Sequence, residues 1–414
     1  MNFSKRTEWD TDESELARAL KERHQAGLPV ADLTASNPTR CGFDYPADLL
    51  RLLTDTAALD YDPNPMGSLI AREAVCRYYR DLGVSATPER IILTTSTSEA
   101  YGYLFKLLLD PGDSILAPQP SYPLFDFLAR VESVGVIAAP FVYDHGWQLD
   151  LEGLRRQITP GSRAVVLVHP NNPTGHFTKR KEAERLAAIC GEHGLALIVD
   201  EVFLDYGLAS EATQSDSSST EDCASFAARE LGVLTFIVSG ISKICGLPQM
   251  KVAWLLAAGP GSNDALARLE VVADTYLSMN APVQLALPSW LAGRGGMQMQ
   301  IRERVRGNLE ELDRALADRA ADSLLVNRLK IEGGWYAVLR VPATQPDELT
   351  VRELLELGVL IHPGYFFGMA ESGWLVASLL TQRREFSLGI SVLLGYFHRK
   401  HESYLRGPDR QSSR

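Results

Sequence analysis

Short, continuous apolar segments rich in β-branched residues recur through the middle of the chain. Several of them, such as the segment at 91–95, are followed by a stretch with helical periodicity. Continuous apolar runs are typical of strands that are buried on both faces, and their alternation with helices indicates a largely parallel α/β sheet. The expected strands are IILTT at 91–95, SILAP at 114–118, AVVLV at 164–168, LALIV at 195–199, LTFIV at 234–238 and VAWLLA at 252–257.

The pattern changes after about residue 290. Five apolar residues between 301 and 316 recur at spacings of 4, 4, 3 and 4, which predicts one long helix with a single apolar stripe. Two later segments, at 333–342 and 373–380, are expected to be strands of a second, smaller domain. The apolar residues of the helix are Ile301, Val305, Leu309, Leu312 and Leu316.

These patterns predict a chain of several regions. We expect an N-terminal arm that includes a segment of the small domain, a large domain, a C-terminal small domain and a flexible tail. The segment at 211–220 is polar and Ser-rich, so it is expected to be a flexible surface insertion. The four regions are expected at residues 1–45, 46–290, 291–405 and 406–414.

Composition and charge argue against several classes of protein. The chain has 414 residues and a formal net charge of −11 at pH 7, which phosphate backbones repel, so nucleic acid is not an expected partner. No apolar run is long enough to span a bilayer, and the charged N-terminus lacks the apolar core of a signal peptide. The five cysteines are scattered without CxxC spacing, which favours reduced thiols and no metal site. We therefore expect a cytoplasmic protein that binds neither membranes nor nucleic acid.

Four polar groups follow four of the expected strands. Lys243 stands in a Ser/Gly-rich turn after the strand at 234–238, and Asp200 and Asn172 follow two other buried strands. The hydroxyl-rich turn at 96–98 leads into a helix, whose first N–H groups and dipole favour a phosphate. Because open α/β sheets bind ligands outside the carboxyl ends of their strands, these groups can converge. Each also has a structural alternative, namely a solvated lysine, a capping aspartate, a simple turn and an ordinary helix cap.

Five short motifs occur in order along the chain: YxxxxxG at 61–67, PQPSYP at 118–123, NPTG at 172–175, DEVF at 200–203 and SK at 242–243. In this order and spacing they resemble those of the fold-type I pyridoxal-phosphate (PLP) aminotransferases of class I/II, the aspartate aminotransferase superfamily. The resemblance extends from SNPT at 36–39 to the expected strand near residue 376. It implies a large PLP-binding domain with a mostly parallel sheet of the seven-stranded type, flanked by helices, and a smaller α+β domain.

The resemblance implies roles for the motif residues in a site for pyridoxal 5′-phosphate, with Lys243, Asp200 and Tyr122 as the catalytic set. Lys243 would form a Schiff base with the cofactor aldehyde and then act as a base, because an amine condenses reversibly with a carbonyl. Asp200 would face the pyridine nitrogen and favour its protonated form. The other implied contacts are Asn172 at the ring 3-oxygen, Tyr122 stacked on the ring, Ser96, Thr97, Ser98 and Lys251 at the phosphate, and Tyr61 at the phosphate of a neighbouring subunit.

The contact from Tyr61 would make the protein a homodimer with shared active sites. The structural alternative for Tyr61 and for Tyr122 is a buried tyrosine of the core. The implied activity is that of a transaminase, which moves an amino group between an amino acid or amine and a 2-oxo acid. A non-transaminating PLP enzyme, such as a lyase or a β/γ-replacement enzyme, is the alternative. A PLP-binding regulator is disfavoured because no basic helix-turn-helix segment precedes residue 40.

Four positions depart from the pattern of the best-known family members. Gly240 stands in place of a phosphate-binding serine, and Lys251 in place of an arginine, which loses the bidentate guanidinium. Phe203 stands where a tyrosine often donates to the ring oxygen. Val376 occupies the position of the arginine that usually binds the substrate carboxylate, and an aliphatic side chain cannot pair a charge.

Substrate recognition is therefore assigned to other residues, Asn37, Arg40 and Asn172. Arg40 follows SNPT, the segment that lines the substrate side of the cofactor in the family, and its guanidinium could bind a carboxylate. A surface arginine at a turn is the alternative for Arg40.

Overall fold

The computed structural model describes residues 2–208, 222–318 and 325–406. The chain divides into two compact units, which we call the large unit and the small unit. The expected Ser-rich insertion at 211–220 and the tail beyond residue 406 lie outside the described residues. The large unit consists of Met1–Trp9, Asn37–Ile301 and Glu332–Gly334, and the small unit of Asp10–Ser36, Arg302–Ile331 and Trp335–Arg414.

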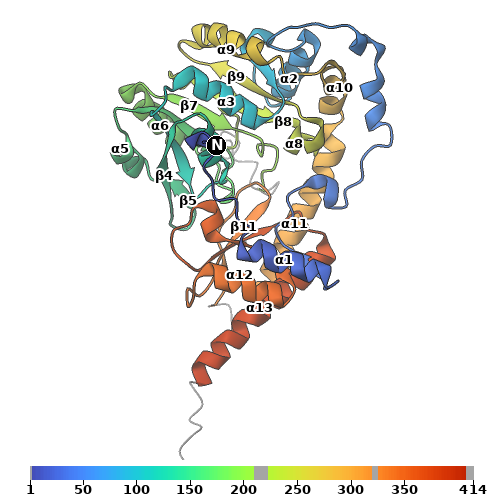
Figure 1. Ribbon diagram of the computed structural model, residues 1–414, viewed down its shortest axis with the longest axis vertical. Helices are drawn as coiled ribbons and strands as arrows, with labels where there is room; N and C mark the ends of the chain where they lie inside the picture. The colour runs from blue at the N-terminus through green and yellow to red at the C-terminus, as the bar shows by residue number, and fades with distance from the viewer. Residues whose placement is uncertain (1, 209–221, 319–324, 407–414) are drawn as a thin grey trace, which may run out of the picture. The chain divides into compact units, whose positions relative to one another are not determined.

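An eight-stranded sheet forms the centre of the large unit, in the order β2-β9-β8-β7-β6-β3-β4-β5 (Figure 1). The pairs β8-β7, β7-β6, β6-β3 and β3-β4 are parallel, and the pairs β2-β9, β9-β8 and β4-β5 are antiparallel. The strands are β2 (Ile91–Thr94), β3 (Ser114–Gln119), β4 (Gly135–Tyr143), β5 (Trp147–Leu149), β6 (Ser162–Val168), β7 (Ala196–Asp200), β8 (Thr235–Gly240) and β9 (Ala253–Ala258). The expected α/β class with a mostly parallel sheet is confirmed.

All six expected apolar segments form strands of this sheet, with ends that differ from the expectation by one or two residues. Strands β4 and β5 were not expected, and they extend the sheet beyond β3. The chain continues with helices after most strands, as the periodicity predicts. The helices of the large unit are α2 (Leu69–Asp81), α3 (Thr97–Leu108), α4 (Leu124–Val131), α5 (Leu151–Gln157), α6 (Arg180–His193), α8 (Ile241–Ile244), α9 (Ser262–Tyr276), α10 (Ala281–Ala292) and the first residues of α11 (Arg294–Asp318).

Helices cover both faces of the sheet. Neighbouring residues of a strand point to opposite sides, and since both are apolar here, each face needs helices to bury it. Leu255 of β9 belongs to a core cluster that includes residues of α3, α4 and α9. The next residue toward the N-terminus, Trp254, instead donates its Nε1–H to the hydroxyl of Tyr79 in α2, at 3.2 Å. Each large apolar side chain buried in such a core contributes about 1.5–3 kcal/mol to folding. The sheet is thus a rigid platform with both faces packed.

Three neighbouring parallel strands bring their carboxyl ends to one edge of this platform. Val168 of β6 pairs with Asp200 of β7, and Asp200 pairs with Val238 of β8. The loops that leave this edge carry the residues on which the candidate site depends.

The small unit contains the antiparallel sheet β10-β11-β14-β13 and the parallel pair β1-β12. The expected helix at 301–316 lies within α11, where Ile301, Val305 and Leu312 of the apolar stripe are fully buried. The expected strands at 333–342 and 373–380 contain β11 and β14. The strands are β1 (Ala31–Asp32), β10 (Asn327–Arg328), β11 (Tyr336–Arg340), β12 (Val359–Leu360), β13 (His362–Pro363) and β14 (Trp374–Ser378), and the helices are α1 (Glu15–Gln25), α12 (Asp347–Glu356), α13 (Arg383–Arg406) and the rest of α11.

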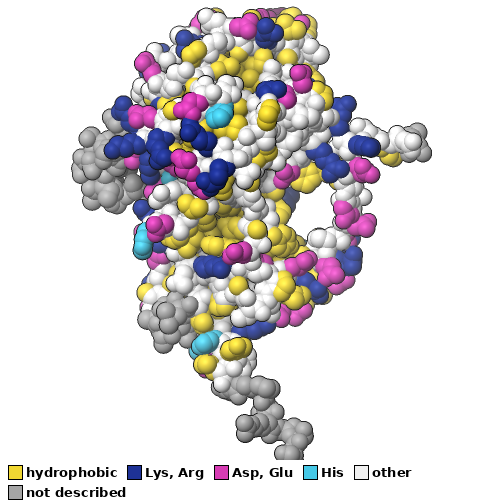
Figure 2. Space-filling model, turned by 90° about the vertical axis from the view of Figure 1, so that its left-hand side faces the viewer, with side chains coloured by type: hydrophobic (Ala, Val, Ile, Leu, Met, Phe, Trp, Pro, Cys, Tyr) yellow, Lys and Arg dark blue, Asp and Glu magenta, His cyan; other side chains and the backbone are white. Residues whose placement is uncertain are grey.

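The surface carries both signs of charge. On the face shown in Figure 2, Lys and Arg side chains are interspersed with Asp and Glu side chains. None of the helices among the described residues is long and apolar enough to cross a membrane.

Candidate active site

Asp200 is the last residue of β7, and its carboxylate is held from two sides. The backbone N–H of Val202 donates to Oδ1 at 3.1 Å, and the hydroxyl of Tyr101 in α3 donates to Oδ2 at 3.3 Å. Burial raises the pKa of this carboxyl to about 6, and these two hydrogen bonds and the charge of Lys243 oppose the rise. Asp200 is therefore a preorganised anion in an apolar setting.

Lys243 lies in α8, the short helix that begins directly after β8. The side chains of Ile241 and Ile244 are fully buried and anchor this helix, and the hydroxyl of Tyr206 donates to the carbonyl oxygen of Lys243 at 2.6 Å. The Lys243 ammonium lies 5.7 Å from the centre of the Phe203 ring. Burial lowers the pKa of Lys243 to about 8, against the opposing attraction of Asp200. The site thus holds an amine that loses its proton readily.

The turn that carries Asn172 is built by its neighbours. The side-chain amide of Asn171 donates to the carbonyl of Pro120 at 3.1 Å and to the hydroxyl of Thr174 at 2.9 Å. Gly175 closes the turn with φ of 71°, a conformation that favours glycine. Asn172 itself is buried, and its Oδ1 has no hydrogen-bond partner among the described residues. Since buried polar atoms are normally paired, this oxygen is available to a hydrogen-bond donor of a ligand.

Tyr122 follows in the loop that the bond between Asn171 and Pro120 ties to this turn. Its side chain is 46% exposed, which excludes the alternative of a core tyrosine. An aromatic ring in this position can cover one face of a planar ligand.

The N-terminus of α3 presents a further part of the candidate site. The hydroxyl of Ser96 caps the helix by accepting the N–H of Glu99 at 3.1 Å, and the Glu99 carboxylate accepts the N–H of Thr95 at 2.7 Å. The ordinary cap is therefore present, as the alternative predicted. Thr97 and Ser98 follow the cap at the positive end of the helix dipole, where an anion is stabilised.

The turn at 37–41 adjoins this group. The thiol of Cys41 acts electrostatically on Lys243 and raises its pKa. Asn37 accepts the N–H and the hydroxyl of Thr39 at 3.1 and 2.8 Å. Arg40 is exposed and makes no ion pair with a described residue.

Tyr61 and Lys251 make no contact with Asp200 or Lys243 in the part of the chain that the structure describes. Tyr61 is 80% exposed, which excludes a buried structural tyrosine in the single chain. Lys251 is exposed as well and has a left-handed backbone with φ of 54°.

The structure explains the glycine at position 240. A Cβ at Gly240 would lie 2.9 Å from both the carbonyl oxygen of Val252 and the Cβ of Ala253. The close approach of β8 and β9 leaves no room for the serine that the family pattern has here. Any hydroxyl contact with a phosphate must come from other residues.

Val376 lies in β14 and is fully buried, paired with Val338 on one side and His362 on the other. It offers no hydrogen-bond donor to a carboxylate. In the folded chain, the position where the family pattern has an arginine is therefore apolar and buried.

Three contact residues of the site, Tyr101, Tyr206 and Cys41, were not recognised from the sequence. Tyr101 lies four residues after Thr97 and so on the same face of α3, which is the signal that could have identified it. Tyr206 and Cys41 act through contacts between distant segments and leave no local pattern.

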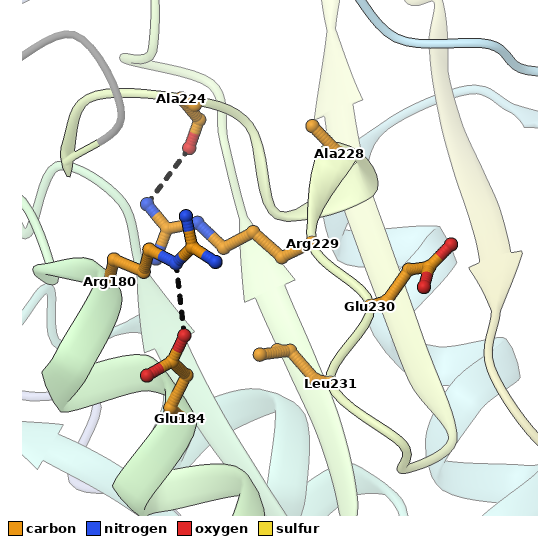
Figure 3. Close-up of a pocket in the computed structure, with 7 residues that line it drawn as sticks. All are labelled: Arg180, Glu184, Ala224, Ala228, Arg229, Glu230 and Leu231. Atoms are coloured by element: carbon orange, nitrogen blue, oxygen red, sulfur yellow. Dashed lines mark hydrogen bonds and ion pairs between the residues drawn. The ribbon is translucent and has the colours of Figure 1, made fainter. Parts of the chain in front are cut away.

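A separate pocket of the large unit lies between α6 and the loop at 224–231 (Figure 3). The side chains of Arg180 and Arg229 reach into it, and Arg180 pairs with Glu184 at 3.0 Å. Glu230 adds a second carboxylate, so the charges balance. None of the expected site residues lines this pocket. Within the described ranges, no group of three or more His, Cys, Asp or Glu residues could hold a metal ion.

Comparisons with known proteins identify the family and the fold that this chain resembles. Residues 62–383 match the family model for aminotransferase class I and II. The chain is 28% identical over 357 residues to the aspartate/prephenate aminotransferase of Thermus thermophilus, covering 85% of this chain and 87% of the relative. It is 27% identical over 280 residues to the glutamate-pyruvate aminotransferase AlaA of Escherichia coli K12, covering 67% of each. The alanine aminotransferase of Pyrococcus furiosus has a similar fold, with a TM-score of 0.81 at 22% identity, over 96% of this chain and 100% of that chain.

The buried carboxylate of Asp200 leads to a prediction about stability. Its pKa of about 6 in the folded protein lies above the value of about 4 in an unfolded chain. The folded state therefore binds more protons between these values, and the free energy of unfolding falls as the pH rises through them. We expect ligand-free Asp200→Asn to be more stable than the wild type by about 1–3 kcal/mol at pH 8, with the difference shrinking toward pH 4.5.

Urea unfolding at both pH values measures this difference. Asp264→Asn is the matched control, because Asp264 is exposed on α9 and pairs only with Arg268 among the described residues. A loss of stability in Asp200→Asn at both pH values would contradict the conclusion that the buried, ionised carboxylate destabilises the fold.

Proposed function

Because the chain belongs to the aminotransferase class I and II family and is a transaminase, we propose that pyridoxal 5′-phosphate is its cofactor and that Lys243 carries it. The observation that supports this most is that a readily deprotonated amine, Lys243, and a buried carboxylate, Asp200, act on each other electrostatically near the ends of the neighbouring strands β8 and β7. Perturbed pKa values of this kind concentrate at functional sites.

The residues present fit the cofactor. Asn172 is buried in its turn, and its side-chain N–H group would donate to the ring oxygen, while Tyr122 supplies an aromatic face. Asp200 supplies the anion for a protonated pyridine nitrogen, and the start of α3 supplies N–H groups and hydroxyls for a phosphate. When bound, the cofactor supplies a carbonyl that exchanges for an amino group and a ring that accepts electrons.

Lys243 has two tasks in this proposal, to hold the cofactor and to move a proton at the substrate α-carbon. Its pKa of about 8 leaves a neutral fraction of the amine at pH 7–8, which an ordinary lysine lacks. The bond from Tyr206 to its carbonyl fixes the backbone from which the side chain extends. A base that is held next to the substrate in this way does not have to reach it by diffusion.

We assign the phosphate to Ser96, Thr97 and Ser98, with Lys251 and the partner subunit's Tyr61 as further contacts. Gly240 has no hydroxyl to contribute, so the N-terminus of α3 would carry more of this interaction than in a serine-bearing site. Lys251 would act as a point charge.

We infer that the substrates are amino acids and 2-oxo acids. Val376 leaves the usual carboxylate position apolar, so a substrate carboxylate needs another cation. Arg40 is assigned this role, with Asn37 and Asn172 beside it. The electrostatic effect of Cys41 on Lys243 supports a position of this turn next to the reacting amine.

We also propose a cytoplasmic homodimer. All five cysteines are free thiols, which supports a reducing compartment. Apolar side chains are exposed on the segment around Tyr61, which supports a subunit interface there. These side chains are Leu50, Leu59, Leu69 and Ile70.

The first prediction of this proposal concerns the attachment of the cofactor. Protein purified with pyridoxal 5′-phosphate should be yellow, and borohydride should fix the cofactor irreversibly on the peptide that contains Lys243. Lys243→Ala should lose this label, whereas the matched variant Lys251→Ala should keep it and bind the cofactor more weakly. Peptide mass spectrometry measures both, and a label on Lys251 is the outcome that overturns the assignment.

The second prediction concerns Arg40. Arg40→Ala should raise KM for amino acid donors about 10- to 100-fold, because a hydrogen-bonded charge pair with the substrate is lost. Its affinity for pyridoxal 5′-phosphate should not change. Arg77→Ala is the control, since Arg77 is an exposed arginine of α2. Steady-state kinetics decides between the alternatives, and unchanged kinetics with plain amines as good substrates would mean that Arg40 reads no carboxylate.

The third prediction concerns the shared site. Mixing inactive Lys243→Ala with an inactive Tyr61 variant should restore about one quarter of wild-type activity, because half of the dimers are hybrids with one intact site. Mixing Lys243→Ala with Asp200→Asn should restore nothing, because one chain supplies both residues. Sedimentation at working concentration should give a dimer, and a monomer would refute the proposal.

A further inference from the structure

The hydroxyl of Tyr101 makes a direct contact with the carboxylate assigned to the cofactor nitrogen. We propose that Tyr101 is a positioning residue that keeps the Asp200 carboxylate oriented and ionised for the cofactor. This inference rests on the proposed function, since it concerns the same site. Nothing in the motifs of the sequence assigns a role to Tyr101.

The carboxylate of Asp200 has one donor on each oxygen. Val202 donates its N–H to Oδ1 at 3.1 Å, from the same strand end, and Tyr101 donates to Oδ2 at 3.3 Å, from a helix that packs against the sheet. A carboxylate held at both oxygens by different elements cannot rotate without breaking a hydrogen bond. Each oxygen keeps a further lone pair for a ligand.

Tyr101 is itself fixed. Its side chain is fully buried, and its ring packs edge-on against Phe125 with 5.3 Å between ring centres, and at 5.9 Å from Phe105. Burial, followed by the negative charge of Asp200, raises the pKa of its phenol well above the ordinary value. The phenol of Tyr101 therefore stays protonated at neutral pH and remains a hydrogen-bond donor.

The position of Tyr101 in α3 links two parts of the site. Thr97 is at the start of this helix, in the proposed phosphate seat, and Tyr101 follows four residues later on the same face. One rigid helical turn thus joins the residues for the phosphate to the residue that holds Asp200.

The electrostatic balance at Asp200 shows what the contact contributes. The titratable groups that act on Asp200 are Tyr101 in α3 and Lys243 in α8, and its neighbour Glu201 is coupled to it by charge repulsion. Burial favours the neutral carboxyl, and the hydrogen bond from Tyr101 favours the anion. Only the anion can stabilise a protonated pyridine nitrogen. Without Tyr101, the neutral form of Asp200 extends toward neutral pH.

The test compares the affinity of cofactor-free wild type and Tyr101→Phe for pyridoxal 5′-phosphate across pH. Loss of the donor should raise the pKa of Asp200 by about one unit. The dissociation constant of the variant should then exceed that of the wild type about five-fold at pH 6 and by less than about 1.2-fold at pH 8. The cofactor's own ionisations are common to both proteins, so the ratio of the two constants isolates Asp200.

Tyr79→Phe is the matched control. Tyr79 is a fully buried tyrosine of α2 whose hydroxyl accepts a hydrogen bond from Trp254 and makes none with Asp200. Its ratio to the wild type should not vary with pH. A pH-independent ratio for Tyr101→Phe, or the same pH dependence in both variants, would overturn the role of Tyr101.

A second measurement separates this inference from the proposed function. The carboxyl carbon resonance of Asp200, assigned by its absence in Asp200→Asn, can be titrated in the cofactor-free protein. Its midpoint should be higher in Tyr101→Phe than in the wild type, and an equal midpoint rejects the inference. Failure of the wild type to bind pyridoxal 5′-phosphate would instead reject the proposed function and leave this titration as the deciding result.

Discussion

The candidate site of the large unit is organised around one electrostatic constraint, the burial of the Asp200 carboxylate within the electrostatic influence of the Lys243 amine. Each group is costly to bury as an ion. Burial therefore raises the pKa of Asp200 and lowers that of Lys243, so that the neutral form of each is favoured. The packed sheet, the short helix α8 and the hydrogen bond from Tyr101 keep the two groups in place against this cost. A site of this kind stores instability that a ligand with complementary charges can relieve.

Most of the central sheet could be predicted from the sequence because its strands are buried on both faces. The segment at 196–200 is apolar at every position before Asp200, and every residue of β7 is buried. Strand β4 was missed because it is partly exposed and contains Pro140, so it lacks the continuous apolar pattern. The pattern reports burial, and where burial is partial the strand leaves a weaker signal.

The site could be predicted where a residue follows a strand directly, as Asp200 and Lys243 do. Contacts between segments that are distant in the sequence could not be predicted. Glu332 accepts the N–H of Phe177 at 3.1 Å and the ammonium of Lys179 at 2.7 Å, and thereby braces the segment that follows the Asn172 turn. About 150 residues separate these partners, and no local periodicity relates positions that only the fold brings together.

The departures from the family pattern also acquire physical reasons in the folded chain. The close approach of β8 and β9 requires glycine at position 240, and the sheet of the small unit buries Val376. Both changes remove a group that would bind an anion, one for a phosphate and one for a carboxylate. In the proposed site, the recognition of negative charge therefore falls to Arg40, Lys251 and the N-terminus of α3.

A crystal structure of the protein with pyridoxal 5′-phosphate would test the central claim most directly. The account predicts continuous density between Nζ of Lys243 and the cofactor, the Asp200 carboxylate within hydrogen-bond distance of the ring nitrogen, and the phosphate at the N-terminus of α3. A cofactor whose ring nitrogen lies away from Asp200, or whose phosphate is bound elsewhere, would contradict it.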